Sequence, residues 1–185
     1  MSRAIGVLES ISIARGIEAA DAMVKAAPIR LYLAKTICPG KFLAMVGGDV
    51  AAVESSISRG VEVLGEYEAD AVVIPNVHES VLLALEGLTE LKEFAASWAL
   101  GVIETFTVVA CVHAADAAVK AGGVHLLEVR PAVGLGGKSF ASMIGDVSAV
   151  ESAVEAGLRR VSGEGMVLST SVIPHISREV LGSLL

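Results

Sequence analysis

The chain is poor in the residues on which small redox sites and nucleic-acid surfaces depend. Only two of its 185 residues are cysteines, Cys38 and Cys111, too few for a disulfide framework and typical of the reducing cytosol. Aromatic residues make up 4% of the chain, and the 21 acidic residues exceed the 14 basic ones, for a net charge of −7. No basic stripe with interleaved aromatics occurs, which argues against nucleic acid as a partner.

The sequence also lacks a membrane signal. No apolar run reaches the ~18 residues that cross a bilayer, and the N-terminus shows no secretory pattern, so we expect neither a membrane protein nor a secreted one. Yet 54% of the residues are hydrophobic. Two small domains cannot bury that much apolar surface internally. Subunit interfaces resemble a domain core cut in half, so the composition predicts a homo-oligomer.

What the sequence does contain is a tandem repeat. Four motifs recur in the same order, with an offset that rises from 95 to 97 and then to 99: AIGVLES at 4 and ALGVIET at 99, EAADAMVKA at 18 and HAADAAVKA at 113, GGDVAAVESSISRG at 47 and IGDVSAVESAVEAG at 144, VVIP at 72 and SVIP at 171. The second copy therefore carries two small insertions, the first within the region matching residues 34–47. We predict one domain at residues 1–92 and a second at 93–185, with a linker at 88–97.

Each copy predicts the same succession of elements. In the first copy these are a strand at 4–9, a helix at 12–27 that Pro28 ends, strands at 29–37 and 42–46, a helix at 50–64 capped by Asp49, a strand at 70–74 and a short helix at 80–85. The order β-α-β-β-α-β is the ferredoxin-like pattern. We therefore predict an α+β fold, a tandem duplication of an antiparallel sheet with helices on one face.

Several residues suggest chemistry that their context does not support. AVGLGGKS at 132–139 is similar to a phosphate-binding loop, but alanine replaces its first glycine and a strand follows where a helix is required. Cys111 lies in an apolar helix and is predicted to be buried. The four histidines show no ligand spacing. Glu9 and Glu104 end equivalent strands, where we expect structural hydrogen bonds.

Lys25 and Lys120 each follow an aspartate by four residues on a predicted helix. One interpretation is an ion pair along the helix, worth ~0.3–0.5 kcal/mol. The other is an edge contact with a neighbouring molecule. The sequence leaves both open.

The repeated motifs A-[IL]-G-x-[LI]-E-[ST], A-A-D-x-x-V-K-A, G-D-V-x-A-V-E and V-I-P resemble those of bacterial microcompartment shell proteins, in particular the tandem-domain class that forms trimers. The resemblance covers essentially the whole chain. It implies a structural protein rather than an enzyme: a homotrimer that forms a pseudohexamer and tiles with other shell proteins around a microcompartment in the cytoplasm. It also implies that Lys25 and Lys120 lie at the tile edge. Asn76 and His175 depart from the family, which has an arginine there.

The stretch TICPGKF at 36–42 resembles members of this family in which a cysteine of this loop contributes to an iron–sulfur cluster. The hairpin loops of both copies are then expected to line a central pore. The implied pore residues are Ile37, Cys38, Pro39, Gly40 and Lys41 in the first copy, and Val133, Gly134, Leu135, Gly136 and Gly137 in the second.

A three-fold axis would bring three copies of Cys38 together. Four thiolates normally hold a [4Fe–4S] cluster, so three would leave one iron for an external ligand. Three thiolates and a water would also suit zinc. We expect a [4Fe–4S] cluster shared by three subunits, which moves electrons across the shell or plugs the pore, with a luminal redox enzyme as a further partner. Lys41 would add positive charge near the cluster if its side chain points that way.

Two other functions remain open at this stage. A metabolite-conducting shell tile with no cluster would use Cys38 only as a small pore-lining residue. An enzyme with Cys38 as a nucleophile beside Lys41 lacks a visible base or oxyanion partner.

Overall fold

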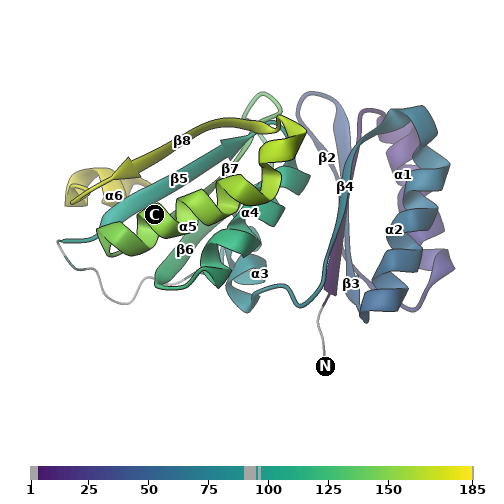
Figure 1. The fold of residues 1–185 in the computed structure, drawn as a ribbon. Helices are drawn as coiled ribbons and strands as arrows, with labels where there is room; N and C mark the ends of the chain where they lie inside the picture. Colours follow the sequence, from purple (N-terminus) through teal and green to yellow (C-terminus); the bar gives the residue numbers. More distant parts are fainter. Residues whose placement is uncertain (1–3, 90–94, 96, 185) are drawn as a thin grey trace. The chain divides into compact units, whose positions relative to one another are not determined.

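A computed structural model describes residues 4–89, 95 and 97–184 (Figure 1). The first copy contains β1 (Ala4–Ser10), α1 (Ile13–Ala26), β2 (Arg30–Ile37), β3 (Lys41–Gly48), α2 (Val50–Leu64), the 3-10 helix η1 (Gly65–Tyr67), β4 (Glu68–Ile74) and α3 (Glu79–Leu85). The second copy contains β5 (Ala99–Thr105), α4 (Val108–Lys120), β6 (Val124–Arg130), β7 (Ser139–Gly145), α5 (Val147–Val161), η2 (Ser162–Glu164), β8 (Val167–Ile173) and α6 (Arg178–Leu184). Within the described residues, no helix has the length and apolar character needed to cross a membrane.

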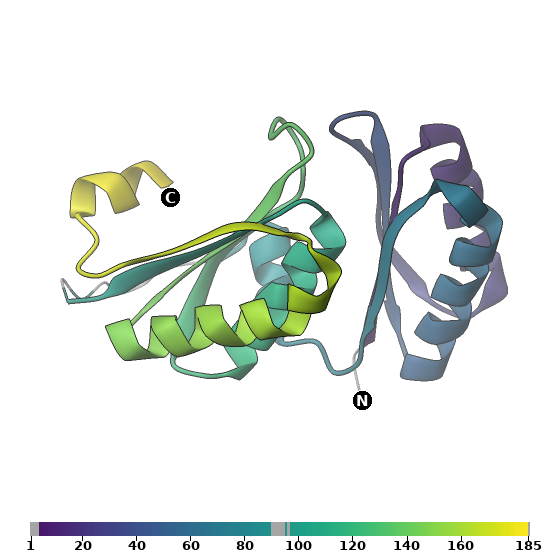
Figure 2. The ribbon, with the colours of Figure 1, turned by 45° about the horizontal axis from the view of Figure 1, so that its top comes forward.

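Each copy builds its own four-stranded antiparallel sheet. The strand orders are β2-β3-β1-β4 and β6-β7-β5-β8, so the two sheets have the same topology. In the first copy, α1 and α2 lie side by side on one face of the sheet (Figures 1 and 2). The predicted α+β fold and its tandem duplication are thereby confirmed.

The duplication extends to the pairing of individual residues. Ala4 faces Gly48 in the first sheet, and Ala99 faces Gly145 in the second. Both edge hairpins have the same register shift, between Leu31 and Leu33 in one copy and at the equivalent place in the other. The two insertions lie where the chain turns. The β2–β3 connection spans residues 38–40 and its counterpart spans 131–138, while the second insertion precedes β8.

The chain divides into two compact units. The first contains the chain through Val77 together with Thr107–Val109 and Ala132–Gly137, and the second contains His78–Phe106, Ala110–Pro131 and Lys138–Leu185. The predicted domain boundary between residues 92 and 93, and most of the predicted linker at 88–97, lie outside the described residues.

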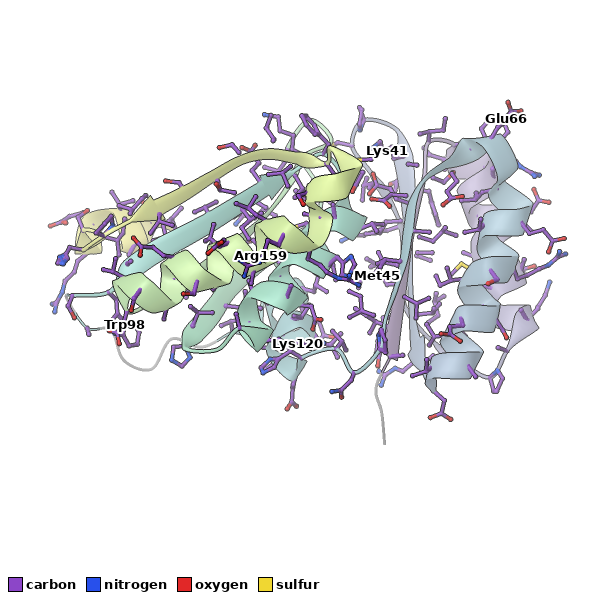
Figure 3. All side chains as sticks on the ribbon, in the orientation of Figure 1. Lys41, Met45, Glu66, Trp98, Lys120 and Arg159 are labelled. Atoms are coloured by element: carbon purple, nitrogen blue, oxygen red, sulfur yellow. The ribbon has the colours of Figure 1, made fainter. Side chains whose placement is uncertain are left out.

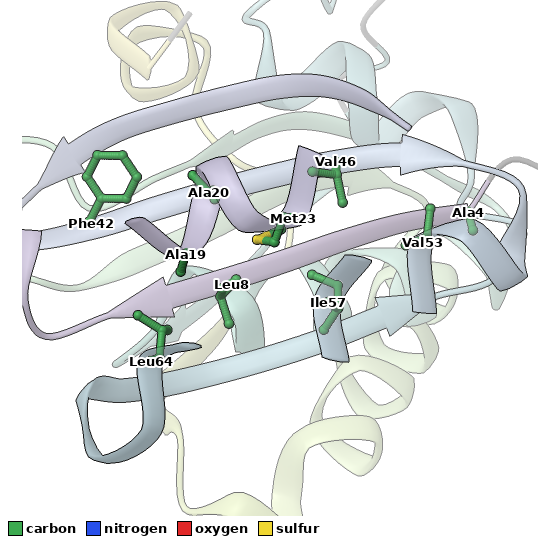
Figure 4. Packing of buried hydrophobic residues seen from close by; sticks show 11 residues of the cluster. Ala4, Leu8, Ala19, Ala20, Met23, Phe42, Val46, Val53, Ile57 and Leu64 are labelled. Carbon is green, nitrogen blue, oxygen red and sulfur yellow. The ribbon is translucent and has the colours of Figure 1, made fainter. Parts of the chain in front are cut away.

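The core of the first unit fills the space between its sheet and the helices α1 and α2 (Figure 4). Small residues on α1 let the helix approach the sheet, and larger side chains from the strands and α2 fill the remaining volume. The buried members of this cluster are Ala4, Leu8, Ala19, Ala20, Met23, Phe42, Ala44, Val46, Val53, Ile57 and Leu64.

The helices α1 and α2 both begin after an N-cap residue, but only one of these residues makes a side-chain capping hydrogen bond. Ser12 caps α1, and its hydroxyl accepts the Arg15 N–H at 3.4 Å. Asp49 occupies the N-cap position of α2 as predicted, but its side chain makes no capping hydrogen bond. The helix begins at Val50 because Gly48 ends the preceding strand and the apolar face of α2 packs on the sheet.

The two copies differ in the sizes of two residues at one contact between a helix and a strand. Gly16 on α1 lies so close to Phe42 on β3 that a Cβ atom added to the glycine would be 2.5 Å from the phenylalanine Cβ. By the repeat offsets, Cys111 stands in place of Gly16 and Ser139 in place of Phe42. The larger helix residue therefore occurs with the smaller strand residue, so the second copy avoids the crowding that a side chain at Gly16 would cause against Phe42.

We predict that Gly16→Ala destabilises the protein by roughly 1–3 kcal/mol, because overpacking outweighs the ~1 kcal/mol that alanine gains in helix propensity. Gly182→Ala is the matched control, since Gly182 lies in α6 with open space around the position of a Cβ. That variant is expected to be neutral or more stable. Urea unfolding at one protein concentration measures both. Equal stabilisation by the two changes would show that the Gly16 contact imposes no size limit.

Candidate functional site

Cys38 lies in the tight turn that joins β2 to β3. Ile37 and Lys41 are paired across the end of the hairpin, and the Gly40 N–H donates to the Ile37 carbonyl at 3.1 Å. The Cys38–Pro39 peptide is cis, and Gly40 has a φ of 86°, which a residue without Cβ adopts readily. The turn consists of the three residues 38–40, with the thiol at the first of them.

Within the first unit, this turn packs on the loop 132–137. The Cys38 N–H donates to the Ala132 carbonyl at 2.8 Å, which anchors the backbone on one side of the thiol. Gly137 approaches Pro39 so closely that a Cβ atom would be 2.7 Å from the proline ring. The structure therefore brings residues from both sets of predicted pore residues together.

The Cys38 thiol is free and half-exposed. An open pocket of about 390 Å³ adjoins it, lined by Ile13, Thr36, Ile37, Cys38, Gly40 and Val133. The described residues of a single chain contain no group of three or more histidine, cysteine, aspartate or glutamate side chains that could hold a metal ion. One chain thus offers one accessible thiol, which fits a shared site and does not fit a site completed within the chain.

Lys41, which is labelled in Figure 3, follows the turn. Its ammonium group is hydrogen-bonded to Glu9. The Lys41 Nζ donates to Glu9 Oε1 at 2.8 Å, and the Val108 N–H donates to Glu9 Oε2 at 2.8 Å. The Glu9 side chain is fully buried. The structural hydrogen bonds expected of Glu9 are confirmed, and the positive charge of Lys41 is directed to this carboxylate.

A second carboxylate supports the same contact. Asp70 is the strand partner of Glu9, and its Oδ2 accepts the Thr107 hydroxyl at 2.6 Å. Burial raises the pKa of Asp70, while the bonds from Thr107 and the Ala71 backbone and the charge of Lys41 act in the opposite direction. Two neighbouring acids at the ends of β1 and β4 therefore bind the segment 107–108 that begins α4.

The equivalent contact in the second copy is incomplete. Lys138 Nζ lies 3.5 Å from Glu104 Oε1, and both side chains are partly exposed. Within the described residues, no backbone N–H donates to Glu104 as that of Val108 donates to Glu9. The pair Lys138–Glu104 is thus a looser version of the pair Lys41–Glu9.

We predict that Lys41→Met lowers the free energy of unfolding by about 2–4 kcal/mol, because it leaves the Glu9 charge buried with only one donor. Lys138→Met removes the equivalent charge beside a solvated carboxylate and is expected to change the stability by less than about 1 kcal/mol. Denaturant titrations at one protein concentration compare them. If the two variants lost the same stability, the burial of Glu9 would not be the source of the difference.

The two predicted tile-edge lysines both form the ion pair along the helix. Lys25 Nζ lies 2.5 Å from Asp21 Oδ2 in an exposed setting. Lys120 Nζ lies 2.6 Å from Asp116 Oδ2, and this aspartate is buried and also accepts the His78 N–H at 2.8 Å. The ion-pair interpretation is confirmed for both lysines, and their contact with a neighbouring tile stays a prediction.

Asn76 and His175, which occupy equivalent positions after β4 and β8, both adopt left-handed backbone conformations. Their φ angles are 53° and 54°. Asparagine tolerates this region better than most residues, and histidine is also enriched there. The two positions therefore keep one backbone geometry while the side chain differs.

A buried histidine near Lys120 was not anticipated from the sequence. Arg160 Nε donates to His113 Nε2 at 2.6 Å, so the imidazole is neutral at this nitrogen. The pKa of His113 is lowered to about 4, mainly by burial; the charges of Arg160 and Lys120 also contribute to the lowering, and the charge of Asp116 opposes it. Comparison of the two copies gives no signal for this pair, because the equivalents of His113 and Arg160 are Glu18 and Val63.

The His113 pKa predicts a loss of stability in acid. The unfolded imidazole takes up a proton near pH 6.5 and the folded one only near pH 4, so the stabilisation is complete above pH 6.5 and lost as the pH falls towards 4. His113→Gln keeps an acceptor for Arg160 without titrating. Between pH 7 and pH 4.5, thermal unfolding of this variant is expected to lose about 1–3 kcal/mol less stability than the wild type does.

The exposed His175 provides the control, because His175→Asn installs the residue found at the equivalent position of the first copy. This variant should retain the pH dependence of the wild type. An unchanged acid loss in His113→Gln would contradict the assignment to His113.

The two copies differ most in the exposure of equivalent helices. On α1, Ile13 is 38% exposed and Ile17 is 55% exposed, while their equivalents on α4, Val108 and Val112, are both fully buried. Val24 is likewise exposed and its equivalent buried. The local structures match residue by residue, yet α1 has an exposed apolar face, whereas the equivalent face of α4 is buried.

The chain matches the model of the BMC domain twice, at residues 4–77 and 99–176. It is 48% identical over 175 residues to the bacterial microcompartment shell protein PduT of Citrobacter freundii, covering 95% of this chain and 94% of that protein. A crystal structure of a microcompartment protein from Desulfitobacterium hafniense DCB superposes with a TM-score of 0.86 at 45% identity, over 98% and 99% of the two chains.

A fused permuted hexameric shell protein from the RMM microcompartment shares the fold, with a TM-score of 0.66 at 18% identity over 87% of this chain and 82% of that one. The chain belongs to the BMC-domain family, with two copies of the domain in tandem. Within that family it is a structural shell tile of a bacterial microcompartment and not an enzyme, which agrees with the resemblance of its repeated motifs.

Proposed function

We propose that this shell tile is a homotrimer, a pseudohexamer of six BMC domains, and that three copies of Cys38 around its central pore hold a [4Fe–4S] cluster. The cluster transfers electrons across the shell or closes the pore. Other shell proteins surround the tile, and a redox enzyme in the lumen is a partner of this electron transfer.

The observation that carries the proposal is the setting of Cys38. Its thiol is free and half-exposed in a hairpin turn, and the turn packs on a loop of the second copy that has no cysteine. A ring of three chains then alternates turns with and without a thiol. Three thiolates are one fewer than a [4Fe–4S] cluster normally takes from the protein, which leaves one iron for a small external ligand.

The chain's own residues fix where the thiol can go. The short hairpin, the Cys38–Ala132 backbone hydrogen bond and the close contact between Pro39 and Gly137 restrain the backbone on both sides of the sulfur. Lys41 pairs with Glu9 at the base of the turn, so its ammonium group is already engaged with a carboxylate of the same unit. When bound, a [4Fe–4S] cluster supplies one-electron transfer.

The apolar face of α1 supports the trimer. A surface with Ile13, Ile17 and Val24 exposed has the character of an obligate interface, while the equivalent side chains on α4 are buried. The alternative function is a metabolite-conducting tile with no cluster. In that case the same half-exposed thiol lines an open channel, and the trimer is unchanged.

The test is anaerobic purification followed by iron and sulfide assays, visible absorption spectroscopy and sedimentation analysis. We expect a trimer with about four iron atoms and four sulfides per three chains, and a brown chromophore. Cys38→Ser should lose the chromophore and remain a trimer. Cys111→Ser is the matched control, because Cys111 is fully buried on α4 with its pKa raised to about 12 by that burial.

Three results would each remove part of the proposal. A colourless, iron-free wild-type trimer would favour the metabolite-conducting tile. Zinc in place of iron and sulfide would replace the cluster by a three-thiolate metal site. A wild-type chain that stays monomeric at all accessible concentrations would refute the ring itself.

A further inference from the structure

The incomplete contact at Glu104 indicates how one chain binds the next. We propose that Glu104 accepts the backbone N–H of Ile13 at the start of α1 in a second copy of this chain. The inference rests on the proposed ring and assigns the contact that joins its subunits.

The template for this contact is already present within the first unit. There Glu9 Oε2 accepts the N–H of Val108, the first residue of α4, while Oε1 accepts Lys41 Nζ. By the repeat offsets, Glu104 is equivalent to Glu9, Lys138 to Lys41, and Ile13 to Val108. Glu104 and Lys138 lie together in the chain, so the one member still missing is a donor equivalent to Val108.

The surface around Glu104 has the right character for such a partner. An open pocket of about 250 Å³ adjoins it, lined by Val102, Glu104, Glu128, Phe140, Ser142 and Leu184. Val102, Glu104 and Phe140 are partly exposed, whereas the equivalents Val7, Glu9 and Leu43 are fully buried. The same strand positions are thus closed in one copy and open in the other.

The start of α1 matches this surface. Ile13 is the first helical residue after the N-cap Ser12, so its N–H has no acceptor within the helix. Its side chain is exposed, while that of Val108 is buried. A carboxylate at the first turn of a helix is also favoured by the helix dipole.

A second pair of elements indicates the same partner. In the second unit, α3 packs on β6, and both Val81 of α3 and Leu126 of β6 are buried. Their equivalents, Val180 of α6 and Leu31 of β2, are both exposed. When α6 of one chain lies on β2 of the next, these two exposed positions are covered by the same chain-to-chain relation that joins Glu104 to Ile13.

The two contacts are not identical in strength. Asp70, which binds Thr107 beside Glu9, is replaced by Ser169 beside Glu104, and Thr107 is replaced by Ser12. Between chains, a single carboxylate therefore does what two carboxylates do within the first unit. Glu104 is for this reason the residue on which the contact depends most.

Two substitutions test the bond from its two sides. Glu104→Ala removes the acceptor. Ile13→Pro removes the N–H, and proline is well accepted at the first helical position, where the preceding Ser12 already has the extended conformation that proline requires. The matched controls are Ile13→Ala, which keeps the N–H, and Glu128→Gln, which removes a charge from the same pocket.

Sedimentation equilibrium of each variant measures the monomer–trimer constant. Loss of one charge-assisted hydrogen bond per interface should weaken association by about tenfold, or about a thousandfold over three interfaces. Ile13→Pro should weaken the trimer much more than Ile13→Ala, and Glu104→Ala more than Glu128→Gln. Thermal unfolding and circular dichroism confirm that each monomer is folded.

Hydrogen exchange provides an independent readout if a variant folds poorly. The Ile13 amide should be protected in the wild-type trimer and exchange rapidly in Glu104→Ala. An unprotected Ile13 amide in the wild-type trimer would overturn this inference. So would association constants of Glu104→Ala and Ile13→Pro that match those of their controls. Either result leaves the shell tile and its trimer in place. A monomeric wild type overturns the inference together with the ring.

Discussion

A fully buried carboxylate must be supplied with donors, and in this protein Glu9 sets that requirement. It takes one donor from the side chain of Lys41 and one from the backbone at the start of α4. The first donor ties the cysteine-bearing hairpin to β1. The second makes Thr107–Val109, from the other sequence copy, part of the first compact unit. The Glu9 side chain thus joins the Cys38 turn to a segment of the second sequence copy. Without these donors its buried charge would strongly destabilise the fold.

The duplication explains why the sequence predicted the fold so well. Two copies of each motif gave two independent views of every element, and the changes in offset showed two insertions, which the structure places where the chain turns. The antiparallel sheet and the hairpin of β2 and β3 were predicted as well, whereas the order of the strands was established by the structure. Asp49 shows the limit of such signals: its position as N-cap was predictable, while its failure to bond depends on side-chain orientation that packing decides.

The site was predictable in part only. Cys38 and the Gly-rich loop were identifiable from residue type and position, but three contacts could be seen only in the folded chain. Lys41 turns to Glu9, Ala132 binds the backbone beside the thiol, and His113 pairs with Arg160. Each joins residues far apart in the sequence, and each is absent from the other copy or altered there. A repeat reveals what two halves share, and these contacts lie where the halves have diverged.

The trade of Gly16 and Phe42 for Cys111 and Ser139 bears on how such a chain can evolve. The two halves retain similar motifs, so recombination between them within one gene could exchange one helix without its strand. The product would set a cysteine against a phenylalanine, or a glycine against a serine, and leave either an overfilled contact or a void. A single-domain chain formed by a crossover between this helix and this strand meets the same barrier. A size match of two residues therefore helps to preserve the fused architecture, and with it two copies of the domain that can carry different chemistry.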